Sequence, residues 1–99
     1  MVRRLGLALG LLVGLAVPAG ADAPRRVLSM NLCTDQLAML MVQPGQLVSV
    51  SYLARDPMAS SMAAQAAALP VNHGLAEEIF RMQPDLVLAG TWTTPATVA

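Results

Sequence analysis

Short runs of strand-type residues alternate with longer helix-type segments through most of this sequence. Residues 27–30 (VLSM) form a brief apolar run, residues 47–52 (LVSVSY) alternate apolar and polar side chains, and residues 86–90 (LVLAG) are apolar without alternation. A strand without polar alternation is typical of a sheet covered on both faces, as parallel sheets between helices are. The pattern predicts an α/β fold in which a three-stranded parallel sheet is flanked by helices.

Three segments have helical character. Residues 33–41 place apolar side chains at helical spacing, residues 59–68 are rich in alanine and methionine, and residues 75–83 set apolar side chains against charged ones. Loops are expected at residues 53–57 and 72–74, which contain Asp-Pro and Asn-His-Gly. The apolar stripe of the first helix is expected to face the core, and its members are Cys33, Leu37, Leu40 and Met41.

The N-terminus has the pattern of a secretory signal peptide. Arg3 and Arg4 precede an apolar run of 13 residues, 5–17, and small residues including Ala19 and Ala21 follow it. A transmembrane anchor is the alternative, but it needs about 20 apolar residues. We therefore expect residues 1–21 to be removed and residues 22–99 to be periplasmic, with no membrane span.

Charge, aromatic content and cysteine content limit the functions that the chain can have. Residues 22–99 carry four arginines against six carboxylates, a net charge of −2, and the whole chain has three aromatic residues. Nucleic-acid binding therefore has neither electrostatic nor stacking support. Cys33 is the only cysteine, so no disulfide forms within the chain, and its place on the helical stripe favours a small core residue over a reactive thiol.

Several segments, in order, resemble a known family. These are RVLSMN at residues 26–31, DQL at 35–37, LVSVSY at 47–52, LAEEI at 75–79 and PDLVLAG at 84–90. Together they resemble the first lobe of the periplasmic substrate-binding proteins of ABC importers for cobalamin and ferric siderophores. The resemblance implies a Rossmann-like lobe, present here only in its N-terminal part (22–99), that forms one wall of a cleft between two lobes.

The resemblance also implies a function without catalysis. Such a protein captures a metal chelate, which is a corrinoid, a ferric siderophore or haem, and delivers it to the ABC permease. It has no cofactor or metal site of its own. The carboxyl ends of parallel strands meet at one edge of a sheet, so ligand-binding residues are expected in the loops there. The candidates are Asn31, Leu32, Tyr52, Arg55, Asn72, His73, Thr91, Trp92 and Thr93.

Trp92 is the leading candidate, because an indole offers a large flat surface to a macrocycle. Arg55 suits the carboxylates of a chelate, or else a local pair with Asp56. His73 suits iron ligation, or else is simply an exposed loop residue. The resemblance places Glu77 at the permease, where a carboxylate would pair with arginines.

Glu77 also has a plain structural interpretation, as part of a solvated helix face with Arg81 at i+4. Residues 94–95 (Thr-Pro) have the pattern of a helix start close to the end of the sequence, so a truncated and non-functional fragment of such a protein is an alternative. A small exported hydrolase that uses Ser29 or Cys33 with His73 is less favoured, because no Gly-x-Ser-x-Gly motif is present.

Overall fold

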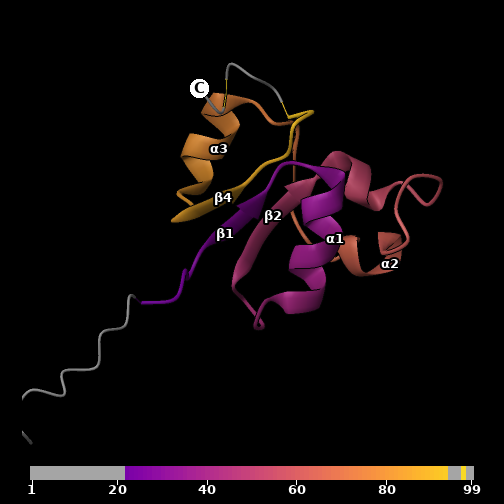
Figure 1. Cartoon of the computed structure of the whole chain (residues 1–99), viewed down its shortest axis with the longest axis horizontal. Helices are drawn as coiled ribbons and strands as arrows, with labels where there is room; N and C mark the ends of the chain where they lie inside the picture. Colours follow the sequence, from indigo (N-terminus) through magenta and orange to yellow (C-terminus); the bar gives the residue numbers. More distant parts are fainter. Residues whose placement is uncertain (1–21, 94–96, 98–99) are drawn as a thin grey trace, which may run out of the picture.

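The computed structural model describes residues 22–93 and residue 97. The predicted signal peptide and the predicted helix start at residues 94–95 lie outside this part. The helices and strands follow one another in the order expected for an α/β chain (Figure 1): β1 (Val27–Ser29), α1 (Leu32–Met41), β2 (Leu47–Ser51), the 3₁₀ helix η3 (Tyr52–Arg55), α2 (Ala63–Ala66), β3 (Val71–Asn72), α3 (Ala76–Met82) and β4 (Leu86–Leu88).

The strands form one parallel sheet in the order β3-β2-β1-β4. The predicted α/β class with a parallel sheet and flanking helices is confirmed, but the sheet has four strands rather than three. Residues 72–74 were expected to be a loop, whereas Val71 and Asn72 pair with Val50 and Ser51. A two-residue strand is too short to show periodicity, and Pro70, whose carbonyl accepts the Val50 N–H, signals a break instead.

Helices cover both faces of the sheet. Val27 on β1 packs in one apolar cluster with Ala38 of α1 and Ala66 of α2, while its neighbour Leu28 packs with Ile79 of α3. Successive side chains of a strand point to opposite faces, so α1 and α2 lie on one side and α3 on the other. Figure 1 shows this arrangement, in which β1 and β2 are the central strands of the layer.

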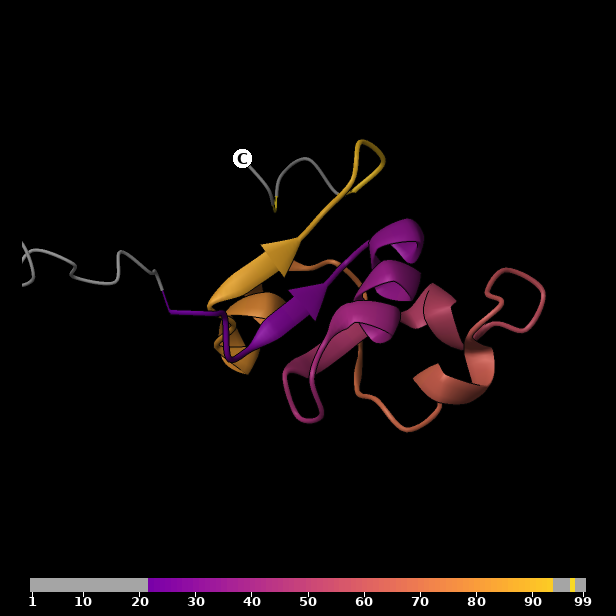
Figure 2. The same cartoon turned by 60° about the horizontal axis from the view of Figure 1, so that its bottom comes forward.

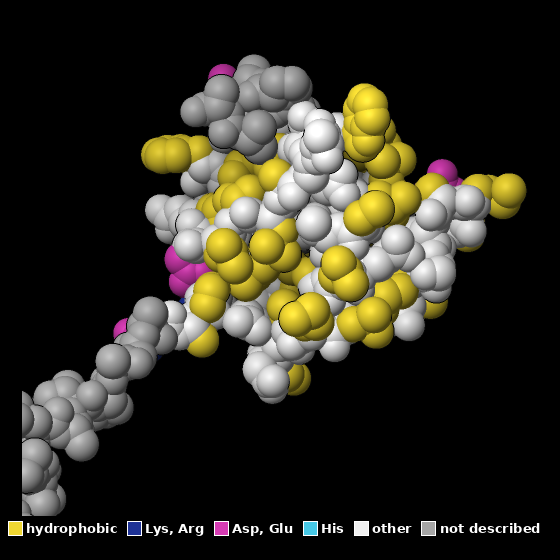
Figure 3. All heavy atoms as spheres, viewed as in Figure 1, with side chains coloured by type: hydrophobic (Ala, Val, Ile, Leu, Met, Phe, Trp, Pro, Cys, Tyr) yellow, Lys and Arg dark blue, Asp and Glu magenta, His cyan; other side chains and the backbone are white. Residues whose placement is uncertain are grey.

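The predicted inward stripe of α1 is wrong. Cys33, Leu37, Leu40 and Met41 are all exposed, and the buried positions of α1 are Asp35 and Ala38. The helix is rotated because Asp35 bonds to the end of β2 and thereby fixes the face of α1 that meets the sheet. Apolar side chains accordingly spread over the surface that carries α1 (Figure 3).

Strand β4 lies at the edge of the sheet and is not covered on both faces as expected. Leu86 and Val87 are exposed, and with Leu37 and Met41 the strand borders an apolar groove of about 410 Å³ on the α1 side. The reason is positional, since α1 packs mainly on β1 and β2 and leaves the edge strand open.

Helix α2 is shorter than the predicted segment 59–68. Residues before Ala63 form turns, in which the Met58 N–H donates to Asp56 Oδ1 and the Met62 N–H donates to Ser60 Oγ. Short polar side chains compete with the helix for backbone hydrogen bonds, and here they outweigh the helix propensity of alanine.

Candidate functional site

A hollow of about 290 Å³ lies at the carboxyl edge of the parallel strands. In Figure 2 the arrowheads of β1 and β4 point the same way, toward the loop that carries residues 90–93. The predicted candidates that meet in this hollow are Asn31, Leu32, Tyr52, His73, Trp92 and Thr93; Met30, Ser51, Leu53 and Gly74 complete the lining. The rule that sites lie beyond the carboxyl ends of parallel strands thus gathers six of nine candidates.

A tight turn after β4 presents Trp92. The Thr93 N–H donates to the Gly90 carbonyl at 3.0 Å, and the Gly90 N–H donates to Thr93 Oγ1 at 2.6 Å. Thr93 is buried by these bonds, while Trp92 projects from the turn with 95% of its surface exposed. An indole held in solvent by a closed turn is available for contact with a ligand.

Asn31, which follows β1, lies beside the turn that carries Trp92. Its Oδ1 accepts the Cys33 N–H at 2.9 Å and so caps the N-terminus of α1, which explains why the helix begins directly after β1. Its side chain lies against the backbone of Gly90, where even a Cβ atom would be only 2.7 Å from Asn31 Nδ2. The glycine is therefore required for the β4 turn to approach the cap of α1.

Tyr52 and His73 form a stacked pair in the hollow. Their ring centroids are 5.2 Å apart and the planes differ by 23°. The imidazole is also held by Glu78 of α3, since His73 Nδ1 lies 3.0 Å from Glu78 Oε1 and the His73 backbone N–H donates to Oε2 at 2.8 Å. Burial alone would raise the pKa of Glu78, but these hydrogen bonds and the charge interaction with His73 hold it below its usual value.

Glu78 was not among the predicted site residues. The sequence carried one signal for it, because a carboxylate in the first turn of a helix commonly accepts hydrogen bonds from backbone N–H groups just before that helix. The left-handed turn at Gly74, with φ of 71°, brings the chain back so that α3 faces His73. The Glu78 carboxylate thus contacts a residue of the hollow, His73, although Glu78 was not predicted to do so.

A buried polar cluster supports the floor of the hollow. Asp35 is fully buried, and its carboxylate accepts hydrogen bonds from the Ser51 N–H at 3.0 Å and the Ser51 hydroxyl at 2.5 Å. Burial raises the pKa of Asp35 in spite of these hydrogen bonds, which act in the opposite direction. The cluster joins α1 to the end of β2 directly beneath Tyr52.

Asn72 lies inside the sheet rather than in the hollow. Its Nδ2 donates to the Ser29 carbonyl, to Ser49 Oγ and to the Val50 carbonyl, and its Oδ1 accepts the Gly74 N–H. The side chain is fully buried and its polar atoms are satisfied by the protein. It ties three strands together instead of facing a ligand.

Arg55 and Thr91 lie outside the hollow. The Arg55 guanidinium donates to the Ala66 carbonyl at 3.3 Å and to the Leu69 carbonyl, so it closes the C-terminus of α2 rather than pairing with Asp56. Such a contact is favourable because helix C-terminal carbonyls are otherwise unpaired. Thr91 is exposed in the β4 turn beside Trp92.

Glu77 is exposed in the first turn of α3. In the part of the chain that the structure describes, no ion pair joins Glu77 to Arg81. The exposure of Glu77 leaves both interpretations open, since a solvated helix face and a docking residue are both solvent-exposed.

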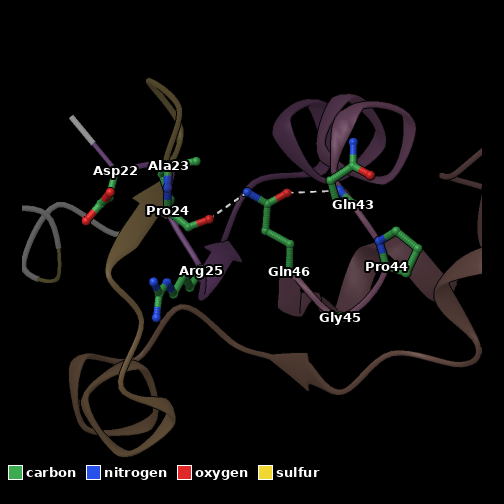
Figure 4. Close-up of a pocket in the computed structure, with 8 residues that line it drawn as sticks. All are labelled: Asp22, Ala23, Pro24, Arg25, Gln43, Pro44, Gly45 and Gln46. Atoms are coloured by element: carbon green, nitrogen blue, oxygen red, sulfur yellow. Dashed lines mark hydrogen bonds between the residues drawn. The ribbon is translucent and has the colours of Figure 1, made fainter. Parts of the chain in front are cut away.

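A second hollow, of about 500 Å³, lies at the amino ends of β1 and β2, opposite to the carboxyl ends of the strands (Figure 4). There Gln46 donates to the Pro24 carbonyl at 2.7 Å and accepts the Gln43 N–H at 2.9 Å, which ties the segment before β1 to the loop after α1. It gathers none of the predicted residues and no aromatic side chain, so the carboxyl-edge hollow is the better candidate.

The alternative hydrolase hypothesis concerns Ser29, Cys33 and His73. Ser29 is fully buried with its hydroxyl 2.7 Å from that of Thr34, and no hydrogen bond joins Ser29 or Cys33 to His73. Among the described residues no three His, Cys, Asp or Glu side chains are grouped as metal ligands, and no helix is long and apolar enough to cross a membrane.

Comparisons with known proteins gave no match. No protein-family model fits the chain, and neither the curated proteins nor the solved structures include a significantly similar one. The likeness to importer binding proteins therefore rests on the residues quoted from the sequence.

Proposed function

We propose that this chain is part of the solute-binding component of an ABC importer, and that the carboxyl-edge hollow contacts a metal chelate in the periplasm. The observation that carries the proposal is the position of Trp92, which stands 95% exposed on the rim of a hollow that also holds the stacked rings of Tyr52 and His73. Aromatic faces at one rim suit a flat, largely apolar macrocycle.

The size of the hollow supports a partial contact rather than full enclosure. Pockets that enclose a small molecule usually have volumes of about 300 to 1,000 Å³, and this hollow, at about 290 Å³, lies at the lower limit of that range. A corrinoid or haem is larger than such ligands, so the hollow would form one wall against one face of the chelate. A second wall facing Trp92 completes the cleft in the proposed binding protein.

Delivery to the permease would use Glu77. Glu77 is exposed in the first turn of α3, and its carboxylate would pair with arginines of a membrane partner. Periplasmic location would follow from removal of residues 1–21.

Tryptophan fluorescence tests the proposal, because Trp92 is the only tryptophan of the chain. We expect cobinamide, haemin or a ferric siderophore to quench its emission in a saturable way. Calorimetry should then show that Trp92→Ala weakens binding about fivefold, since loss of an aromatic contact costs about 1 kcal/mol and about 1.4 kcal/mol corresponds to a tenfold change. Phe80→Ala is the matched control, because Phe80 is also largely solvent-exposed, at 82% on α3, but does not line the hollow. Absence of saturable quenching by every chelate contradicts the proposal.

A further inference from the structure

The His73 imidazole is oriented as metal-binding histidines are. Its Nδ1 faces Glu78 Oε1 at 3.0 Å, and an ionised carboxylate can only accept, so Nδ1 carries the hydrogen. In the neutral ring Nε2 then keeps its lone pair. Metal-bound histidines almost always donate their second ring N–H to a carboxylate, a carbonyl or water, which fixes the tautomer and raises the basicity of the ligating nitrogen.

The surroundings leave the Nε2 edge accessible. Tyr52 covers one face of the ring and Glu78 occupies the Nδ1 edge, yet 58% of the His73 side chain is exposed. The backbone is anchored from below, since the Gly74 N–H donates to the fully buried Asn72. The imidazole is therefore held on one face by Tyr52 and at its Nδ1 edge by Glu78.

We propose that Nε2 of His73 is an axial ligand to the metal of a flat chelate that has an open or exchangeable coordination position. This rests on the proposed function and narrows its ligand class to tetrapyrrole-type chelates, in preference to siderophores that fill all six positions of iron. The step is a ligand exchange without oxidation or reduction: the Nε2 lone pair forms the new bond to the metal, and a bound water leaves.

A single protein ligand suffices for such a complex. The macrocycle supplies the equatorial nitrogens, so the protein needs no group of three ligating side chains, and none is found among the described residues. Trp92 would contact the plane of the macrocycle beside His73, as both line the same hollow. Binding of one flat chelate would therefore use both His73 and Trp92.

Visible absorption spectroscopy tests the ligation on the chain purified after export. The probes are diaquacobinamide, whose axial waters exchange, dicyanocobinamide, whose axial positions are blocked, and a hexadentate ferric trihydroxamate. We expect diaquacobinamide to show the band shift of imidazole coordination, and the two blocked chelates to show none. His73→Ala should abolish the shift.

Glu78→Gln tests the positioning of the ring. We expect a loss of about 10- to 100-fold in affinity for diaquacobinamide, which is the usual effect of removing the partner of a ligating histidine. Asp56→Asn removes an exposed carboxylate outside the hollow and should leave the affinity unchanged. Circular dichroism of each variant checks that the fold is retained.

The outcomes separate the two proposals. Saturable quenching of Trp92 without a coordination shift, or a shift that persists in His73→Ala, overturns the ligation and leaves chelate binding standing. Absence of quenching by all three probes and by haemin overturns chelate binding and the ligation with it.

Discussion

Substitution of Gly90 by alanine should displace the side chain of Asn31, which caps the N-terminus of α1. A Cβ atom at this position would lie 2.7 Å from Asn31 Nδ2 and 2.8 Å from Asn31 Cγ, which is closer than real Cβ atoms approach, so the asparagine side chain must move. The backbone of Gly90 is not in the left-handed region, so alanine adds no backbone strain of its own. The cost comes from the lost hydrogen bond between Asn31 Oδ1 and the Cys33 N–H.

The magnitude follows from the capping energy. Loss of an asparagine N-cap costs about 0.5–2 kcal/mol, whereas a glycine-to-alanine change at a compatible site gains about 0.4–1 kcal/mol through the unfolded state. Gly90→Ala should therefore be destabilising or neutral in the natural chain and stabilising in the Asn31→Ala background. The coupling between the two substitutions should be about 1 kcal/mol, or about 4–8 °C in Tm for a chain of this size.

Urea and thermal denaturation of the two single variants and the double variant measure this coupling. Gly45→Ala is the contrasting control, because Gly45 has φ of 80° and open space around it, so its cost is backbone strain and must not depend on Asn31. Equal destabilisation by Gly90→Ala in both backgrounds would refute the close approach of the β4 turn to the cap.

Two further predictions concern pH. The pKa of the buried Asp35 carboxyl is raised in the folded chain, so the folded chain binds the Asp35 proton more tightly than the unfolded chain does. The free energy of unfolding should therefore fall as the pH rises from about 3.8 through the raised pKa of Asp35. Asp35→Asn should flatten this part of a plot of the urea midpoint against pH. A plot that the substitution leaves unchanged contradicts the prediction. The pKa of Asp85 is lowered by hydrogen bonds from the Arg25 and Arg26 N–H groups, so its contribution is lost on acidification. Asp85→Asn should therefore lose less stability below pH 4 than the natural chain does.

The sheet was predictable where the strands are long enough to show a pattern. The runs around β1, β2 and β4, each separated from the next by helical segments, gave the parallel α/β class. The expected cover on both faces of β4 was wrong, because β4 is an edge strand. Strand β3 was missed because two residues have no period. The orientation of α1 was missed because a buried carboxylate, Asp35, outweighs the apolar side chains in choosing which face meets the sheet.

The candidate site was predictable in position but not in detail. Topology places the ends of parallel strands together, so Asn31, Tyr52 and Trp92 were expected at one rim. Asn72 and Arg55 instead donate hydrogen bonds to backbone carbonyls within the fold. Their partners lie far along the chain, so the spacing of residues in the sequence does not show these contacts. The pairing of Glu78 with His73 depends likewise on the backbone turn between them.

The all-parallel sheet has a consequence for how the chain folds. Each strand pair joins residues far apart in sequence, and β1 meets β4 through Val27 and Leu86. No local hairpin can start the sheet, because parallel neighbours need a long crossover. Formation of such contacts is slow, since loop-closure entropy is lost before the pairing energy is gained. For a chain proposed to cross a membrane through a narrow translocation channel, that delay would keep the polypeptide extended until passage is complete.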